Sequence, residues 1–86
     1  MNNTLAFKIK AIALNIRNKR EFRNYTQEYL AFKLNISQNA YSKIELGYTK
    51  ITVERLFQIA EVLEFDVTDL INPAELSASR AVGVSA

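Results

Sequence analysis

The sequence predicts an all-α, compact domain built from five helices. Its 86 residues are enough for one hydrophobic core and too few for two. Glycine occurs twice and proline once, so the chain has few positions at which a helix must break. Apolar residues recur at helical spacing in the first half, and the alternation typical of strands does not persist anywhere.

The first helix is predicted from apolar residues that recur every three or four positions and therefore share one face. They are Leu5, Ile9, Ile12 and Ile16. We expect this face to point into the core and the helix to end near Asn24, because asparagine readily adopts the left-handed conformation. Lys8 and Lys10 interrupt the stretch, so it is neither a signal peptide nor a membrane span, and we expect no membrane contact.

Capping residues delimit the next two helices. Thr26 is a suitable N-cap for the second helix, and Asn35 can adopt the left-handed conformation that ends it. Ser37 is a suitable N-cap for the third helix, and Gly47 is its natural stop.

Two further helices are predicted after Gly47. Thr52 can cap a fourth helix that runs to Leu63. We expect its apolar residues to point inward or to lie on the flank: Val53, Leu56, Phe57, Ile59, Ala60 and Leu63. Asp66, with Asp69 three residues later, resembles the capping box of a short fifth helix that ends before Pro73.

Residues 1–72 therefore form one predicted domain. The remaining residues, 73–86, are small and weakly polar and have no strong period. We expect this tail to be flexible, with docking onto a partner as the alternative.

The missing residue types narrow the function. The chain has no cysteine and no histidine, so it lacks a disulfide framework, the usual zinc ligands and the usual acid–base group at neutral pH. Two glycines cannot form a phosphate-binding loop. We expect no enzyme activity, no metal and no cofactor, and the absence of cysteine fits a cytoplasmic setting.

The charges are distributed unevenly along the chain. Residues 1–50 carry nine lysines and arginines against three acidic residues, whereas residues 51–86 carry two against six. A basic end suggests a polyanionic partner on that side. The alternative is a solvated distribution that suits the helix dipoles.

The most informative segment is residues 27–46, QEYLAFKLNISQNAYSKIEL. Two short helices that meet at about a right angle need a small residue where their backbones approach, here Ala31, and a left-handed residue in the turn, here Asn35. They also need apolar positions that hold the pair together and onto another helix: Leu30, Leu34, Ile36, Tyr41 and Ile44. All these requirements are met in register.

From about Ile12 to Ile71 the sequence resembles the helix-turn-helix domains of phage repressors, Cro proteins and Xre-type bacterial regulators. The most specific stretches are TQEYLAFKLNISQNAYSKIELG and LFQIAEVLEFDVTDLI. The resemblance implies a five-helix, lambda-repressor-like DNA-binding domain that regulates transcription, usually as a repressor. Glu64 departs from the family pattern, because glycine or asparagine would ease the helix end at that position.

The resemblance places the third helix, residues 37–46, in the major groove of double-stranded DNA. At 100° per residue, one polar arc of this helix carries Gln38, Asn39, Ser42 and Lys43. The wheel puts Ala40, Tyr41 and Ile44 on the opposite side. Glutamine and asparagine can bridge adenine N6 and N7, lysine can reach guanine O6 or N7, and serine can bond a base or a phosphate, so we predict that the polar arc contacts bases. The alternative is a merely solvated helix face.

A second predicted set contacts the DNA backbone. It consists of Gln27, Arg17, Lys19, Tyr48, Thr49 and Lys50. Gln27 opens the second helix, where main-chain N–H groups attract anions. Tyr48, Thr49 and Lys50 match positions at which the family holds the sugar–phosphate backbone, whereas ordinary surface charge is the alternative for each cation.

The resemblance also implies that Arg20 and Glu45 pair with each other and hold the third helix against the first. Their predicted role is structural.

A further apolar stripe, opposite the core face of the first helix, contains Phe7, Ala11 and Leu14. A domain of this size has no second core to bury it, and exposed contiguous apolar surface is uncommon on a monomer. We predict a homodimer interface that includes Phe7 and Leu14, as suits a palindromic operator. The alternatives are a frayed terminus with Phe7 folded back, or an interface on the later helices around Phe57, Val62 and Phe65.

Together these observations predict a sequence-specific, double-stranded DNA-binding transcriptional regulator, with repression as the expected mode. An antitoxin or an adaptor that uses the same fold to hold a protein partner is the alternative.

Overall fold

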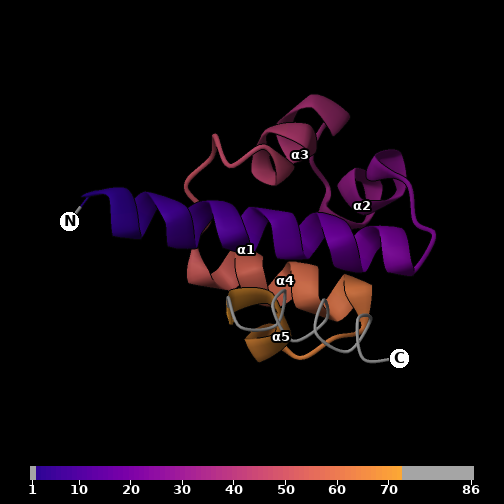
Figure 1. Ribbon diagram of the computed structural model, residues 1–86. Coiled ribbons are helices and arrows are strands. Elements are labelled where there is room, and N and C mark those ends of the chain that lie inside the picture. The colour runs from indigo at the N-terminus through magenta and orange to yellow at the C-terminus, as the bar shows by residue number, and fades with distance from the viewer. Residues whose placement is uncertain (1, 73–86) are drawn as a thin grey trace.

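A computed structural model describes residues 2–72 of the chain, so the predicted tail, 73–86, lies outside the described residues. The helices are α1 (Asn2–Phe22), α2 (Gln27–Leu34), α3 (Gln38–Glu45), α4 (Val53–Leu63) and α5 (Val67–Ile71). The described range contains no strand, so the all-α prediction is confirmed. Helix α1 runs through the middle of the molecule, with α2 and α3 on one side of it and α4 and α5 on the other (Figure 1). Among residues 2–72, no helix combines the length and the apolarity needed to cross a membrane.

Three of the four predicted helix caps are confirmed. The side-chain oxygens of Thr26, Ser37 and Thr52 each accept a hydrogen bond, 3.0 Å long, from the backbone N–H three residues later. The capping box predicted at α5 is wrong, because Asp66 precedes the helix without making a side-chain cap bond. The backbone N–H of Asp69 donates instead to the main-chain oxygen of Asp66 at 2.9 Å, so the donor that a cap would satisfy is already bound.

Left-handed residues follow the ends of the first four helices. Asn24, Asn35 and Glu64 each have φ of 61°, and Gly47 has φ of 78°. Asparagine and glycine tolerate this conformation, whereas a glutamate pays a steric penalty of about 1–2 kcal/mol there. The end of α4 is therefore a strained position.

We expect Glu64→Gly to raise the free energy of unfolding by about 1 kcal/mol, because glycine removes most of that penalty. Urea unfolding with an unchanged slope would measure the gain. The control is Glu61→Gly, three residues earlier on the exposed side of α4, which should lower stability by about 1 kcal/mol because it lies in helical conformation. Destabilisation by both variants would contradict the strain at Glu64.

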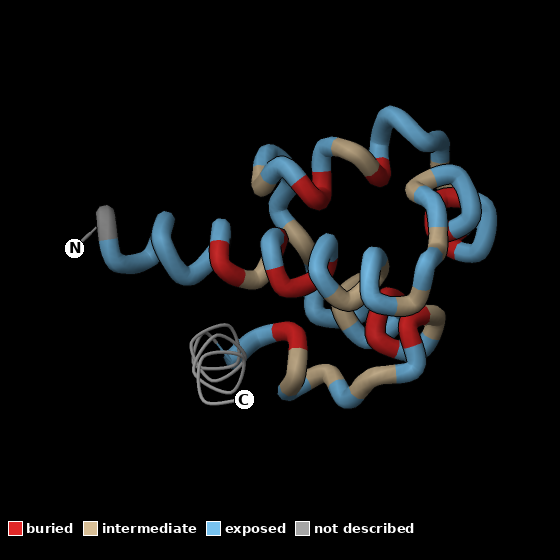
Figure 2. The backbone as a smooth tube through the Cα atoms, turned by 45° about the vertical axis from the view of Figure 1, so that its right-hand side comes forward, coloured by how far each residue is buried: buried red, intermediate tan, exposed pale blue. Residues whose placement is uncertain are grey.

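Every helix contributes a fully buried side chain to one core. Ile16 comes from α1, Leu30 from α2, Tyr41 from α3, Ile59 from α4 and Leu70 from α5, each with 0% of its surface exposed. In Figure 2 the buried segments face a common centre. The core thus holds all five helices in one unit.

The N-terminal half of α1 differs from the prediction. Leu5 and Ile9, predicted as core, are 61% and 43% exposed, because α1 is longer than the body it packs on and its first turns extend past that body (Figure 2). Ala11, predicted on the outward stripe, is buried. One turn after it, the buried amide of Asn15 donates to the main-chain oxygen of Leu70 at 2.8 Å, so this side of α1 faces α5 rather than solvent.

Candidate nucleic-acid interface

Helices α2 and α3 pack against each other through a short turn. The backbone N–H of Ile36 donates to the carbonyl of Ala31 at 3.0 Å. Ala31 itself is buried, as expected of a small residue where two backbones approach. This turn orients α3 so that one side rests on the core and the other faces outward.

The outward side of α3 carries the predicted polar arc. Gln38, Asn39 and Lys43 are exposed, and Ser42 is half-buried. Ala40 was predicted on the inward side and is exposed. The buried residues of α3 are Tyr41, Ile44 and Glu45, and Ala40 lies at the edge of the outward arc.

A groove of about 380 Å³ lies between α3 and the segment that leads into α4. It brings Asn39 and Lys43 of α3 together with Thr49 and Lys50. Its apolar lining comes from Ile36, Ala40, Ile44 and Ile51. Residues predicted separately for base and backbone contacts therefore border one concave surface.

Arg55 also borders this groove, although the sequence did not predict it as a contact residue. Its guanidinium donates from Nη1 to the main-chain oxygen of Leu34 at 3.3 Å and to Oε1 of Gln58 at 3.1 Å. It therefore links the first turn of α4 to the end of α2. No local pattern separates Arg55 from other surface cations, since its position depends on how α4 packs.

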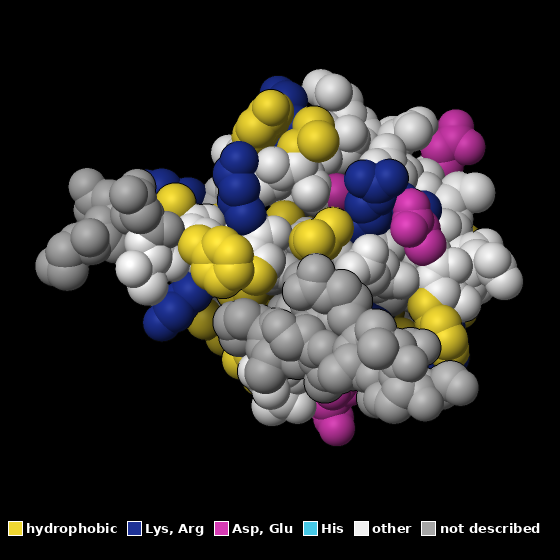
Figure 3. Space-filling view, viewed as in Figure 1, with side chains coloured by type: hydrophobic (Ala, Val, Ile, Leu, Met, Phe, Trp, Pro, Cys, Tyr) yellow, Lys and Arg dark blue, Asp and Glu magenta, His cyan; other side chains and the backbone are white. Residues whose placement is uncertain are grey.

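Lys10 is a second missed cation. A methyl group at Gly47 would lie 3.6 Å from Cγ of Lys10 and 3.9 Å from Cβ of Ala13, so the turn after α3 rests directly on α1. This contact places Lys10 beside Gly47, and the next residue, Tyr48, is exposed. In Figure 3, lysine and arginine side chains lie over α1 and near α3 on the visible face.

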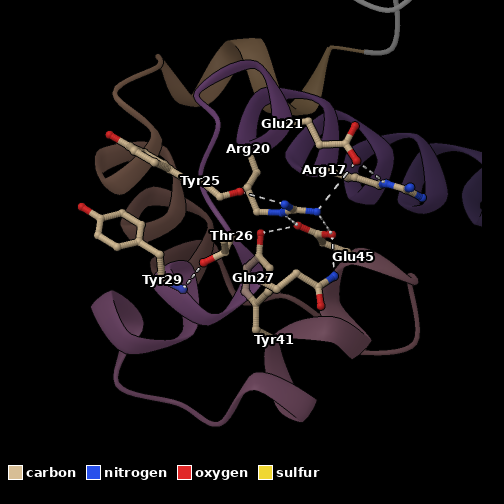
Figure 4. Close-up of polar contacts among 9 residues, drawn as sticks. All are labelled: Arg17, Arg20, Glu21, Tyr25, Thr26, Gln27, Tyr29, Tyr41 and Glu45. Carbon is tan, nitrogen blue, oxygen red and sulfur yellow. Dashed lines mark hydrogen bonds and ion pairs between the residues drawn. The ribbon is translucent and has the colours of Figure 1, made fainter.

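Glu45, at the end of α3, is the centre of a polar network (Figure 4). Arg20 donates to both of its carboxylate oxygens, from Nε at 2.6 Å and from Nη2 at 3.1 Å. Gln27 donates its amide N–H to Oε1 at 3.0 Å, and the Tyr41 hydroxyl donates to Oε2 at 2.6 Å. Arg20 also donates from Nη1 to the carbonyl of Tyr25 at 2.9 Å. The network joins α1, α2 and α3.

The electrostatics of this network favour one charge state. Burial alone would raise the pKa of Glu45, but hydrogen bonds from Arg20, Tyr41 and Gln27 outweigh burial and hold that pKa below its ordinary value. The hydrogen bond to Glu45 raises the pKa of Arg20. Burial, followed by the hydrogen bond to Glu45, raises the pKa of Tyr41. At neutral pH the pair is therefore charged and Tyr41 is a neutral donor.

The network changes how Gln27 can meet a phosphate. One N–H of its amide is bound to Glu45, and its carbonyl oxygen is an acceptor like the phosphate itself. Only the second amide N–H and the main-chain N–H groups at the start of α2 remain suitable.

The other predicted backbone cations occupy different surroundings. Arg17 is exposed and donates from Nε to Oε2 of Glu21 at 3.1 Å. The ammonium of Lys19 lies 4.8 Å from the centre of the Phe65 ring, on the side of α1 where α4 and α5 pack (Figure 1). The structure therefore separates Lys19 from the residues around α3.

Phe65 and Val62 were predicted in an alternative dimer surface, and both are half-buried and pack against the core. The guanidinium of Arg23 lies 4.5 Å from the centre of the Phe65 ring, and the Phe22 ring meets it edge-on at 6.0 Å. Intramolecular contacts therefore account for Phe65. Of that predicted surface, Phe57 alone is exposed, at 54%.

Comparisons with known proteins also indicate a helix-turn-helix fold. A family model described as helix-turn-helix matches residues 16–70. The crystal structure of the clp gene regulator ClgR from Corynebacterium glutamicum is similar in fold, with a TM-score of 0.74 at 23% sequence identity over 91% of this chain and 81% of that chain. No curated protein matches the sequence. The chain belongs to the helix-turn-helix family, in the Cro/C1-type, lambda-repressor-like branch of DNA-binding transcriptional regulators.

Proposed function

We propose that this protein binds operator-like double-stranded DNA as a homodimer, reads the major groove with α3 and represses transcription. The observation that carries the proposal is the outward arc of α3. It presents amide and ammonium groups to solvent while the opposite side of the helix is buried in the core and in the Glu45 network. The major groove, about 12 Å wide, admits a helix of this kind.

The side chains of the arc differ in what they can read. Gln38 and Asn39 each carry an amide that can donate to adenine N7 and accept from adenine N6. Lys43 can donate to guanine O6 or N7. Ser42 is half-buried, so its short hydroxyl is confined to a base or phosphate directly beneath α3. These four residues form the proposed base-reading set.

The proposed backbone contacts surround the arc. Thr49 and Lys50 border the groove beside α3 together with Arg55. Lys10 and Tyr48 lie at the turn that follows α3. Gln27 with the start of α2, and Arg17 on α1, complete the set. Cations in these positions neutralise phosphates on the flanks of a helix that occupies the major groove.

Selection of bound fragments from random duplex DNA tests the proposal. We expect enrichment of one short motif in two inverted half-sites, because the two-fold symmetry of a dimer matches a palindromic site. A reporter with the selected site placed over its promoter should then lose expression when the protein is present. Recovery of unenriched fragments would rule out sequence-specific reading, and raised expression would rule out repression.

Lys50→Ala is expected to weaken binding to every duplex sequence. It should also reduce the slope of log affinity against log salt by about one unit, because one phosphate is no longer neutralised and its counterions are no longer released on binding. Titrations at several salt concentrations measure that slope. Lys33→Ala, which removes an exposed lysine on α2, is the matched control and should leave the slope unchanged. An unaltered slope in Lys50→Ala would remove Lys50 from the contact set. Salt independence of the wild type would favour the adaptor alternative.

A further inference from the structure

The first turns of α1 form an apolar projection, which we call the overhang and define as residues 4–10. Leu5, Phe7 and Ile9 are 61%, 66% and 43% exposed. Leu5 and Ile9 lie in line with Ile16, which is fully buried, so the overhang continues the core-facing side of α1 past the end of the body (Figure 2). It also lies before the residues that match the family model.

The overhang is basic as well as apolar. Lys8 and Lys10 are exposed, and no acidic residue precedes Glu21 in the chain. A surface that covers the overhang must therefore offer both apolar contact and negative charge.

One outward face of α4 offers both. At about 100° per residue, Val53, Glu54, Phe57 and Glu61 fall within an arc of about 100°. All four are exposed, Val53 and Phe57 at 71% and 54%. We call this surface the α4 face. Val53 and Phe57 lie one helical turn apart with acidic side chains beside them, and contiguous exposed apolar surface rimmed by polar residues is typical of interaction sites.

We propose that the overhang of one copy of this chain packs on the α4 face of a second copy, and the reverse. Leu5 and Ile9 then meet Val53 and Phe57. Lys8, on the flank of the Leu5–Ile9 stripe, meets the acidic edge formed by Glu54 and Glu61. Phe7 and Lys10 lie on other sides of α1 and stay outside this contact. Because each copy supplies both surfaces, the exchange closes as a two-fold dimer. Helix α3 lies on the other side of α1 from α4 (Figure 1), so the proposed DNA surface stays open.

The proposal deepens the homodimer of the proposed function, and it can be tested without DNA, so the two can fail separately. Sedimentation equilibrium compares wild type with Lys8→Glu, with Glu54→Lys/Glu61→Lys and with an equimolar mixture of the two variants. Each variant alone should self-associate at least about tenfold more weakly, because the ion pairs in both exchanged contacts become repulsions. The mixture should recover wild-type association, because both exchanged contacts again join opposite charges.

The apolar part has its own variant and control. Leu5→Asp/Ile9→Asp should weaken association by about 100-fold, because buried apolar anchors dominate interfaces. Phe32→Asp replaces a side chain that is 79% exposed on α2 and should leave association unchanged. Circular dichroism and thermal melting confirm that each variant is folded.

Three results overturn the proposal. The first is a wild type that stays monomeric at millimolar concentration. The second is undiminished association of the charge variants. The third is weakened association that the mixture does not recover, which would place the overhang against something other than the α4 face.

Discussion

Arg20→Ala and Glu45→Ala are each expected to lower the free energy of unfolding by about 3–5 kcal/mol, because either change leaves its partner partly buried and unpaired. The side chains of Arg20 and Glu45 are only 12% and 3% exposed, so water cannot replace the missing partner. Glu45→Ala also removes the acceptor of Tyr41 and Gln27. Urea or thermal unfolding gives the losses.

The double variant is expected to lose less than the sum of the two single variants, because no charge is then left alone. Arg17→Ala is the matched control, since the Arg17–Glu21 pair is more than half exposed and surface pairs contribute about 0–1 kcal/mol. Additive losses in the cycle would show that Arg20 and Glu45 do not stabilise each other.

The same pair predicts a pH dependence. The folded-state pKa of Glu45 lies below its ordinary value, so the contribution of Glu45 is complete above the unfolded value of about 4.3. As pH falls from that value through the lower folded pKa, the unfolded chain binds a proton that the folded chain does not, and the free energy of unfolding falls. Glu45→Gln should flatten this part of the pH profile, and an unchanged profile would exclude Glu45 as its source.

Gln38→Ala and Lys43→Ala are each expected to abolish discrimination at one base pair of the selected site, at a cost of about 1–3 kcal/mol, or about 5- to 150-fold in affinity. The reason is that each side chain would supply a bidentate or charged contact to a base edge. Binding should be measured on the selected site, on each single-base-pair variant of it and on random duplex.

Lys50→Ala is the control for this experiment, because a phosphate contact should lower affinity for all these duplexes equally. If Gln38→Ala and Lys43→Ala behave as Lys50→Ala does, these two side chains contact the backbone and read no bases. The distinction needs no structure of the complex.

Local chemistry explains why most helix boundaries could be predicted. A cap requires one hydroxyl and one N–H three residues later, so Thr26, Ser37 and Thr52 identify helix starts without reference to the rest of the fold. Asn24 and Asn35 are similarly local, because the left-handed conformation depends on the residue itself. Asp66 shows the limit of the pattern, since a main-chain acceptor took the bond that its side chain could have made.

The candidate site was predictable only in part. The helical wheel placed Asn39 and Lys43 correctly on the outward side of α3, because periodicity follows from helix geometry alone. It misplaced Ala40, because the width of a buried stripe depends on which neighbours press against the helix. It could not find Lys10 or Arg55, which reach the site from α1 and α4 through tertiary packing.

The sequence by itself determined the five helices, the segment that joins α2 and α3, and the residue types that can read DNA, because each follows from spacing and side-chain chemistry within a few turns. Tertiary structure alone decided where α1 leaves the body. Leu5 and Ile9 have the same period as Ile16, yet burial requires an element opposite them, and within residues 2–72 both remain exposed. It also decided that Phe65 lies beneath Lys19 and Arg23, because contacts between residues more than 40 positions apart leave no trace in local periodicity.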